Sequence, residues 1–158
     1  MSSPNPVDYF AIQNTLARYC IALDTKDFTL FDQIFTPDVD AIYPFRSAMK
    51  GAQELAAAIE QRHHRLTHIT SQHALTTQMI EIDAGGTKAS AVTYFTGIHF
   101  GKGTWQGKEV TAWGKYVDSL VLVEGEGALP GARGRWLICR RETVFMGRLG
   151  EEGVMDGE

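Results

Sequence analysis

The sequence has few cysteines, no long apolar run and no excess of positive charge. Its two cysteines cannot form a disulfide framework, and we expect Cys20 and Cys139 to be reduced core residues of a cytoplasmic protein. No apolar stretch approaches the roughly 20 residues of a membrane span, and the start, Met1–Pro6, lacks the basic and apolar segments of a secretion signal. The formal net charge of -4 argues against a nucleic-acid or membrane partner, which would need a basic patch.

Several common functional motifs are also missing. There is no glycine-rich phosphate loop, no Cys-x-x-Cys, no His-Glu-x-x-His and no Gly-x-Ser-x-Gly. His63 and His64 are adjacent, whereas a helical metal site needs ligands three or four residues apart. We therefore expect no metal and no cofactor, and look for chemistry among acids, imidazoles and phenols.

The length of 158 residues fits one domain over 1–158. We expect an ordered core over about 7–146, and a flexible tail from Gly147 onward, because that glycine- and acid-rich segment has little to bury.

Helical patterns fill the first part of the chain and strand patterns fill the rest. Apolar residues at helical spacing predict a first helix, and Asp27 is a natural N-cap for a second. The segregation predicts an α+β fold in which three N-terminal helices pack on one face of a curved sheet. The predicted helices are Val7–Leu23, Phe28–Phe35 and Ala52 to about Arg65, with a short strand at Val39–Tyr43. Four long strands follow: the two strands of a hairpin, then Glu109–Val123, then Arg135–Phe145.

The hairpin lies within Thr67–Phe100 and carries one histidine on each strand. Its turn contains Gly85-Gly86 between two β-branched runs, which is a hairpin signal. If a three-residue loop pairs Asp83 with Thr87, His73 and His99 share one face as diagonal neighbours, roughly 7–8 Å apart at the backbone.

Two other outcomes of the hairpin register are open. A two-residue loop would put the histidines on opposite faces, and a bulge between the turn and either histidine would upset the count. We favour the three-residue loop, in which His73 faces Gly97 and His99 faces Ser71, because the shared face then also gathers Leu75, Met79, Ala91 and Phe95.

Four residues are candidates for catalysis: Asp24, Tyr43, His73 and His99. Each also has a plain structural interpretation, as a solvated loop aspartate, a packing tyrosine or a core histidine. Alternation places Tyr116 and Asp118 on one side of their strand. The candidate substrate-binding residues are Tyr116, Asp118, Phe28, Phe45, Leu75, Phe95 and Trp113.

Together these segments resemble the SnoaL-like branch of the nuclear transport factor 2-like superfamily, over roughly Tyr9 to Phe145. The resemblance rests on a helix that ends in an aspartate, on Phe-Thr-Pro-Asp after the second helix, and on Ser-Gln-His in the hairpin. It implies a cone-shaped, highly curved mixed sheet that encloses a pocket with the three helices. The segments are Tyr19–Asp27, Leu30–Asp38, Ser71–His73, Gly114–Asp118 and Arg135–Ile138.

Within the superfamily the pattern is most similar to the scytalone dehydratases. The resemblance implies that Asp24 is the partner of a catalytic His73, with His99 as a second imidazole and Tyr43 as a phenol. The chain departs from that family at Leu23, where the family has a second phenol. It also departs at Tyr116 and Asp118, where the family has serine and asparagine, so we expect a different substrate.

The leading hypothesis is a cofactor-free lyase that dehydrates a small apolar polyketide- or terpenoid-type compound through an Asp–His dyad. An isomerase or cyclase with the same residues is the first alternative, and a non-catalytic binding or dimerisation module is the second. Val92, Tyr94 and Ile98 alternate with the histidine face, so we also expect a homodimer through the outer face of the sheet.

Overall fold

The structure is a computed structural model that describes residues 5–64 and 69–156. Its elements are α1 (Pro6–Thr25), η1 (Phe28–Gln33), β1 (Phe35–Tyr43), β2 (Arg46–Lys50), α2 (Ala52–His64), β3 (Thr70–Ile82), β4 (Lys88–Phe100), η2 (Gly103–Trp105), β5 (Glu109–Val123), β6 (Arg135–Gly150) and α3 (Gly153–Asp156).

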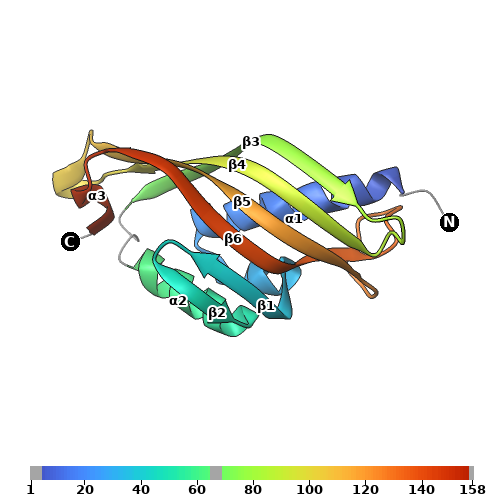
Figure 1. Cartoon of the computed structure of the whole chain (residues 1–158). Coiled ribbons are helices and arrows are strands. Elements are labelled where there is room, and N and C mark those ends of the chain that lie inside the picture. Colours follow the sequence, from blue (N-terminus) through green and yellow to red (C-terminus); the bar gives the residue numbers. More distant parts are fainter. Residues whose placement is uncertain (1–4, 65–68, 157–158) are drawn as a thin grey trace.

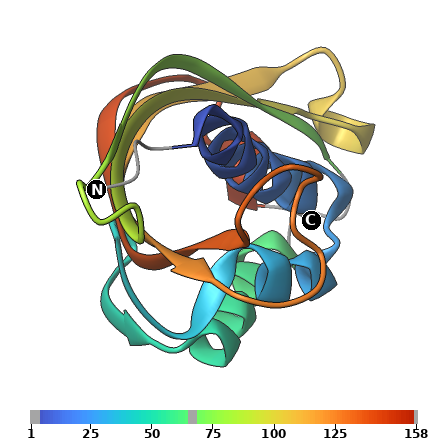
Figure 2. The same ribbon diagram turned by 90° about the vertical axis from the view of Figure 1, so that its right-hand side faces the viewer.

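One six-stranded sheet, in the order β2-β1-β6-β5-β4-β3, forms the frame of the molecule. The β1–β6 pair is parallel and the other pairs are antiparallel. The sheet curls around α1, drawn in blue, without closing (Figure 2), while α2 packs against β1 and η1. The predicted α+β class, the curved mixed sheet and the N-terminal helices are confirmed.

Local signals explain where α1 begins and ends. Asn5 caps it by accepting a hydrogen bond from the backbone N–H of Val7, and Pro6 occupies the first turn, where no partner for its nitrogen is needed. The helix ends where Lys26 turns left-handed, with a φ of 57°. Its apolar stripe faces the sheet, as helical spacing predicts.

The elements after α1 agree only in part with those predicted from the sequence. Asp27 caps η1 by accepting from the backbone N–H of Thr29, as predicted, but η1 is a short 3₁₀-helix. The chain is already extended at Phe35, so β1 begins earlier than expected. Strand β2 was not predicted; it pairs with β1 after a short turn. The expected end of α2 at about Arg65 and the expected hairpin start at Thr67 lie outside the described residues.

The β3–β4 hairpin differs from the prediction at its turn and agrees with it at the histidines. Asp83 pairs with Lys88 rather than Thr87, as the backbone hydrogen bond from the Asp83 N–H shows. A bulge between Leu75 and Gln78 then adds one residue to β3, which restores the predicted pairing beyond it. His73 therefore faces Gly97, and His99 faces Ser71. Met79, between the turn and the bulge, is the exception: its side chain is 58% exposed and lies off the histidine face.

The C-terminal segment is also more structured than the sequence suggested. Strand β6 runs past Phe145 to Gly150, and α3 follows. The backbone N–H of Glu151 donates to the carbonyl oxygen of Glu109 at 2.8 Å. Val154 is buried against Ile69 and Val110, which explains why this segment folds back onto the sheet (Figure 1).

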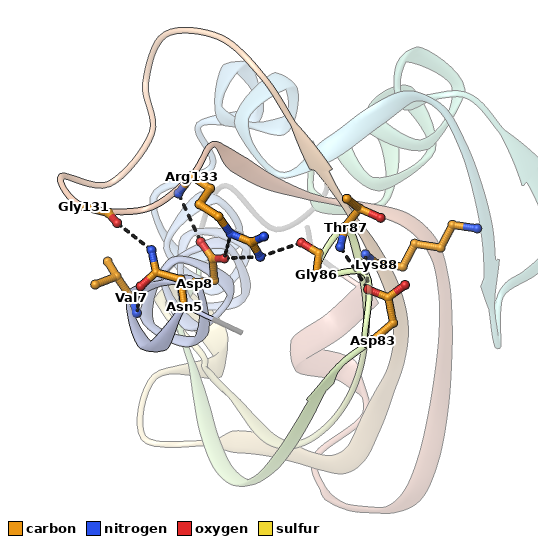
Figure 3. Close-up of polar contacts among 9 residues, drawn as sticks. All are labelled: Asn5, Val7, Asp8, Asp83, Gly86, Thr87, Lys88, Gly131 and Arg133. Atoms are coloured by element: carbon orange, nitrogen blue, oxygen red, sulfur yellow. Dashed lines mark hydrogen bonds and ion pairs between the residues drawn. The ribbon is translucent and has the colours of Figure 1, made fainter. Parts of the chain in front are cut away.

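A polar clamp holds the end of the molecule opposite α3. Figure 3 shows Arg133, from the β5–β6 connection, between the first turn of α1 and the β3–β4 turn. Its Nε donates to the buried Asp8 at 2.7 Å, and its Nη2 donates to the carbonyl oxygen of Gly86 at 2.6 Å. Asn5 donates from the same turn to the carbonyl of Gly131. These bonds join the first turn of α1, the β3–β4 turn and the β5–β6 connection at one end of the fold.

The outer face of the sheet is partly apolar. Tyr94, Trp113 and Val117 are 38%, 38% and 37% exposed, on adjacent strands. No helix within the described ranges is long and apolar enough to cross a bilayer.

Candidate active site

A cavity opens at the end of the molecule where α1 and α2 finish and where α3 packs. It is small, about 80 Å³. A dry cavity of about 150 Å³ can hold one benzene, so this one suits a compact ligand of at most about one ring. Its aromatic lining consists of Tyr19, Tyr43, Phe45, Phe95, Tyr116 and Phe145, and its polar lining of Arg62, His63, His73, His99, Thr143 and Arg148.

Asp24 and His73 meet at the wall of this cavity. The Nδ1 of His73 lies 2.7 Å from the Oδ1 of Asp24. The His73 side chain is 8% exposed and the Asp24 side chain is 23% exposed. The residues come from the last turn of α1 and from the start of β3. Two predicted candidates that are far apart in the sequence are thus hydrogen-bonded in the fold.

The Asp24 carboxylate stands in an otherwise unfavourable position. A negative charge near a helix C-terminus faces the negative end of the dipole, at a cost of about 0.3–1 kcal/mol. Strand β3 offsets this with two further donors, the Ser71 hydroxyl at 2.9 Å and the His73 backbone N–H at 2.9 Å. Burial alone would raise the pKa of Asp24, but the hydrogen bonds from His73 and Ser71 and the His73 charge lower it overall. Asp24 is therefore ionised at neutral pH.

An ionised carboxylate can only accept hydrogen bonds, so the His73 Nδ1 must carry the proton it donates. A ring that carries its one proton on Nδ1 has a free lone pair on Nε2. That atom lies beside Gly97, whose backbone lines the cavity; a Cβ built there would lie 3.2 Å from it. Gly97 therefore leaves room for the ring at the position where the two strands face each other.

His99 stands edge-on to His73, with ring centroids 5.6 Å apart and an interplanar angle of 88°. Burial, and then the charges of His73 and Arg148, lower the pKa of His99 to about 4. Burial and the nearby His73 and His99 likewise lower the pKa of His63 to about 3. Both imidazoles are neutral at pH 7, so they can exchange hydrogen bonds with a ligand without adding charge.

Two phenols form a hydrogen-bonded pair in the cavity lining. The hydroxyl of Tyr43 lies 2.8 Å from that of Tyr19, and both residues line the cavity. Tyr19 precedes Leu23 by one helical turn, so it projects from the same face of α1. Tyr19 therefore supplies a second phenol beside the position where Leu23 lacks one. Burial raises the pKa of both tyrosines, which keeps their hydroxyls protonated as donors.

Beneath the phenols lies a fully buried ion pair that corrects one prediction. Asp118 accepts two hydrogen bonds from Arg141, each 2.8 Å long, and both side chains are 0% exposed. The Arg141 guanidinium lies 4.3 Å from the ring of Tyr19 and 4.1 Å from that of Tyr116. Asp118 is thus a support for the cavity floor rather than a residue that faces a substrate.

The other predicted substrate-binding residues divide into two groups. Phe45, Phe95 and Tyr116 line the cavity, and Phe95 stacks on Tyr116 with ring centroids 4.5 Å apart. The remaining three do not line it: Phe28 and Leu75 are half-buried and pack against the core, and Trp113 is 38% exposed on the outer face of the sheet.

Sequence reasoning missed Tyr19, Arg62, His63 and Arg148 as lining residues. By its spacing Tyr19 is one more apolar residue on the buried side of the first helix, and Arg62 and His63 belong to a cationic run near the end of the third, so neither pattern marks a cavity. Arg148 reaches the inner face because β6 has a bulge opposite Trp113 and Gly114, which reverses the alternation. No signal in the sequence marks that bulge. Among residues 5–64 and 69–156, no three His, Cys, Asp or Glu side chains are close enough to hold a metal ion.

Comparison with known proteins identifies the family of the chain and its fold. The SnoaL-like domain model matches residues 7–142, so the chain belongs to the SnoaL-like domain family. No curated protein sequence matches it significantly.

Solved structures share the fold at low identity. A putative scytalone dehydratase from Novosphingobium aromaticivorans has a TM-score of 0.73 at 20% identity, covering 92% of this chain and 88% of its own. A type 2 hexachlorocyclohexane dehydrochlorinase (LinA) has a TM-score of 0.71 at 13% identity, with 93% and 90% covered. Aln2 from a Streptomyces species has a TM-score of 0.72 at 16% identity, with 91% and 94% covered.

Proposed function

We propose that this protein is a cofactor-independent acid–base lyase that removes water from a small, mainly apolar β-hydroxy carbonyl compound of polyketide or terpenoid type. The observation that carries the proposal is the 2.7 Å contact between Asp24 and His73 at the wall of an aromatic cavity. Membership of the SnoaL-like family supports it, and two proteins of similar fold are named for eliminations, a dehydratase and a dehydrochlorinase.

In this mechanism His73 is the base. Its Nε2 takes the proton from the carbon next to the substrate carbonyl, and the ionised Asp24 stabilises the imidazolium that forms. The electron pair of the broken C–H bond forms an enolate, which then expels the β-hydroxyl. The imidazolium returns the proton to that hydroxyl, so water leaves and the enzyme is restored. Such positioned acid–base groups contribute typically about 10²–10⁴-fold in rate.

The other polar groups have supporting roles. Tyr43 donates a hydrogen bond to the carbonyl oxygen, where negative charge develops, and Tyr19 holds its hydroxyl at 2.8 Å. His99 has a pKa of about 4, so at neutral pH it orients the leaving hydroxyl as a neutral imidazole and is not the acid.

The test uses 3-hydroxycyclohexanone, a one-ring probe. We expect exchange of its α-protons in deuterated water and, in a parallel run in ordinary water, formation of 2-cyclohexenone with a loss of about 18 mass units. His73→Ala and Asp24→Asn should each slow both processes at least about a hundredfold. Asp32→Asn, an exposed aspartate on η1, is the matched control and should keep the wild-type rate. Wild-type rates in the two dyad variants would contradict the proposal.

Two other outcomes identify the alternatives. Exchange, or conversion of 3-cyclohexenone to 2-cyclohexenone, without any loss of water would indicate an isomerase or cyclase that uses the same dyad. Probe binding without exchange would indicate a binding module.

The proposal includes a cytoplasmic location, to which the two free cysteines are suited. It also includes a homodimer through the outer sheet face, and a monomeric mass by light scattering would contradict that part.

A further inference from the structure

The lining of the cavity is richer in cations than in carboxylates. Two guanidinium groups line it, Arg62 from the last turn of α2 and Arg148 from β6. The imidazoles of His63 and His99 beside them are neutral at pH 7 and add no charge. None of the described lining residues is an aspartate or glutamate. The chain as a whole is acidic, with 19 acidic and 15 basic residues, so this local excess of cations runs against its composition.

Both arginines keep guanidinium N–H donors that have no partner among the described residues. The Cζ of Arg62 lies 4.7 Å from the centre of the Phe45 ring, and its guanidinium has no hydrogen bond or ion pair with the described residues. The Nη2 of Arg148 pairs with Glu152 at 2.9 Å, but that glutamate is 64% exposed. The Arg148 Nε is buried and, among the residues that the structure describes, has no partner.

The two cations also affect each other and the histidines. Burial, and then the charge of Arg148, lower the pKa of Arg62. The charges of Arg148 and Arg62 help to lower the pKa of His99. Like charges held together in a partly dry cavity cost free energy, and an anion bound between them would remove that cost. The same field draws anions toward the opening.

We propose that Arg62 and Arg148 form a subsite for an oxyanion, a carboxylate or a phosphate, that the substrate carries on its apolar body. This rests on the proposed function only in that the same cavity holds the substrate. A guanidinium is a planar fork of donors that matches such groups, and stacking on Phe45 leaves the edge of the Arg62 fork free.

The subsite gives the substrate a direction. With its anion held by the arginines, the apolar body extends toward Phe95 and Tyr116, and the reacting carbon toward His73. The substrate is then a small hydroxy-keto acid, or the corresponding phosphate, and the neutral probe 3-hydroxycyclohexanone reacts at the same dyad without the contribution of the anion to binding.

Calorimetry on the full chain tests the subsite with three probes of similar shape: benzoate, phenyl phosphate and benzyl alcohol. We expect one or both anions to bind more tightly than the alcohol, and their ranking distinguishes the carboxylate from the phosphate. Arg62→Gln and Arg148→Gln should each weaken the preferred anion by about ten- to a hundredfold, since each removes a charged hydrogen bond.

Two control variants separate anion binding from effects on the fold. Glu152→Gln removes the ion pair of Arg148 but keeps its charge, so anion binding should be unchanged or tighter. Lys88→Gln removes one exposed cation at the β3–β4 turn, at the far end of the molecule, and should bind as wild type. In the wild type, the bound anion should also raise the pKa of His99 from about 4, as measured by NMR.

Three results would overturn the proposal: an alcohol that binds as tightly as both anions, arginine variants with wild-type affinity, or a Glu152→Gln variant that loses affinity as Arg148→Gln does. Failure of the proposed function has a different signature, because the protein would then bind benzoate but exchange no α-protons.

Discussion

The buried ion pair under the cavity gives the sharpest stability prediction. Asp118→Asn would keep the shape of the side chain and remove its charge, leaving the Arg141 guanidinium uncompensated where both side chains are 0% exposed. Removing one partner of a buried pair costs about 3–5 kcal/mol in the free energy of unfolding. For a chain of this size, each kcal/mol lowers Tm by about 2–4 °C, so we expect a fall of about 6–20 °C.

Urea unfolding followed by circular dichroism measures this loss, with calorimetry for Tm. Asp40→Asn is the matched control, because Asp40 pairs with Lys50 at 3.3 Å while the side chains are 49% and 82% exposed. Such an exposed pair contributes about 0–1 kcal/mol. Equal small losses in the two variants would refute the idea that the Asp118–Arg141 pair supports the cavity floor.

Two further predictions concern the Asp24–His73 pair. Gly97→Ala would place a Cβ 3.1 Å from the His73 Cδ2, so the ring must move by a few tenths of an ångström. Because this displaces the base, we expect kcat/KM on 3-hydroxycyclohexanone to fall about tenfold with little change in Tm. An unchanged kcat/KM would contradict the geometry. The pKa of Asp24 is lower in the folded chain than in the unfolded one, so its contribution to stability is full above about pH 4 and is lost as pH falls through the lowered folded pKa. The stability difference between wild type and Asp24→Asn in urea should therefore shrink between pH 6 and pH 2.5; a constant difference would show that Asp24 does not have the lowered pKa.

Much of the fold could be predicted because its signals are local. The cap at Asp27, the helical stripe of α1 and the alternation of β5 each depend on residues within a few positions of one another. Strand β2 carries little such signal, since four of its five residues are exposed. The tail after Gly147 looked featureless, because what fixes it is a contact of Val154 with residues more than forty positions away.

The histidine face illustrates how two errors can cancel. The turn contains one residue more than predicted, which alone would have placed His73 and His99 on opposite faces. The bulge between Leu75 and Gln78 restores the predicted register at the histidines. Only Met79, between the turn and the bulge, shows the error, because the bulge restores the predicted register before the chain reaches the histidines.

The candidate site was predictable where the family resemblance placed residues and not where packing did. Asp24 and His73 were expected to meet, and their atoms lie 2.7 Å apart. Asp118 was misplaced because alternation correctly points it inward but does not reveal Arg141 opposite. Arg148 was missed because a bulge in β6 decides its direction.

The proposed mechanism depends on where the proton sits on His73. Nitrogen-15 NMR of the imidazole side chains at neutral pH measures this directly. We expect a protonated Nδ1 that donates to Asp24 and an unprotonated Nε2 facing the cavity, with that preference lost in Asp24→Asn. A proton on Nε2 in the wild type, unaffected by the Asp24→Asn substitution, would contradict it.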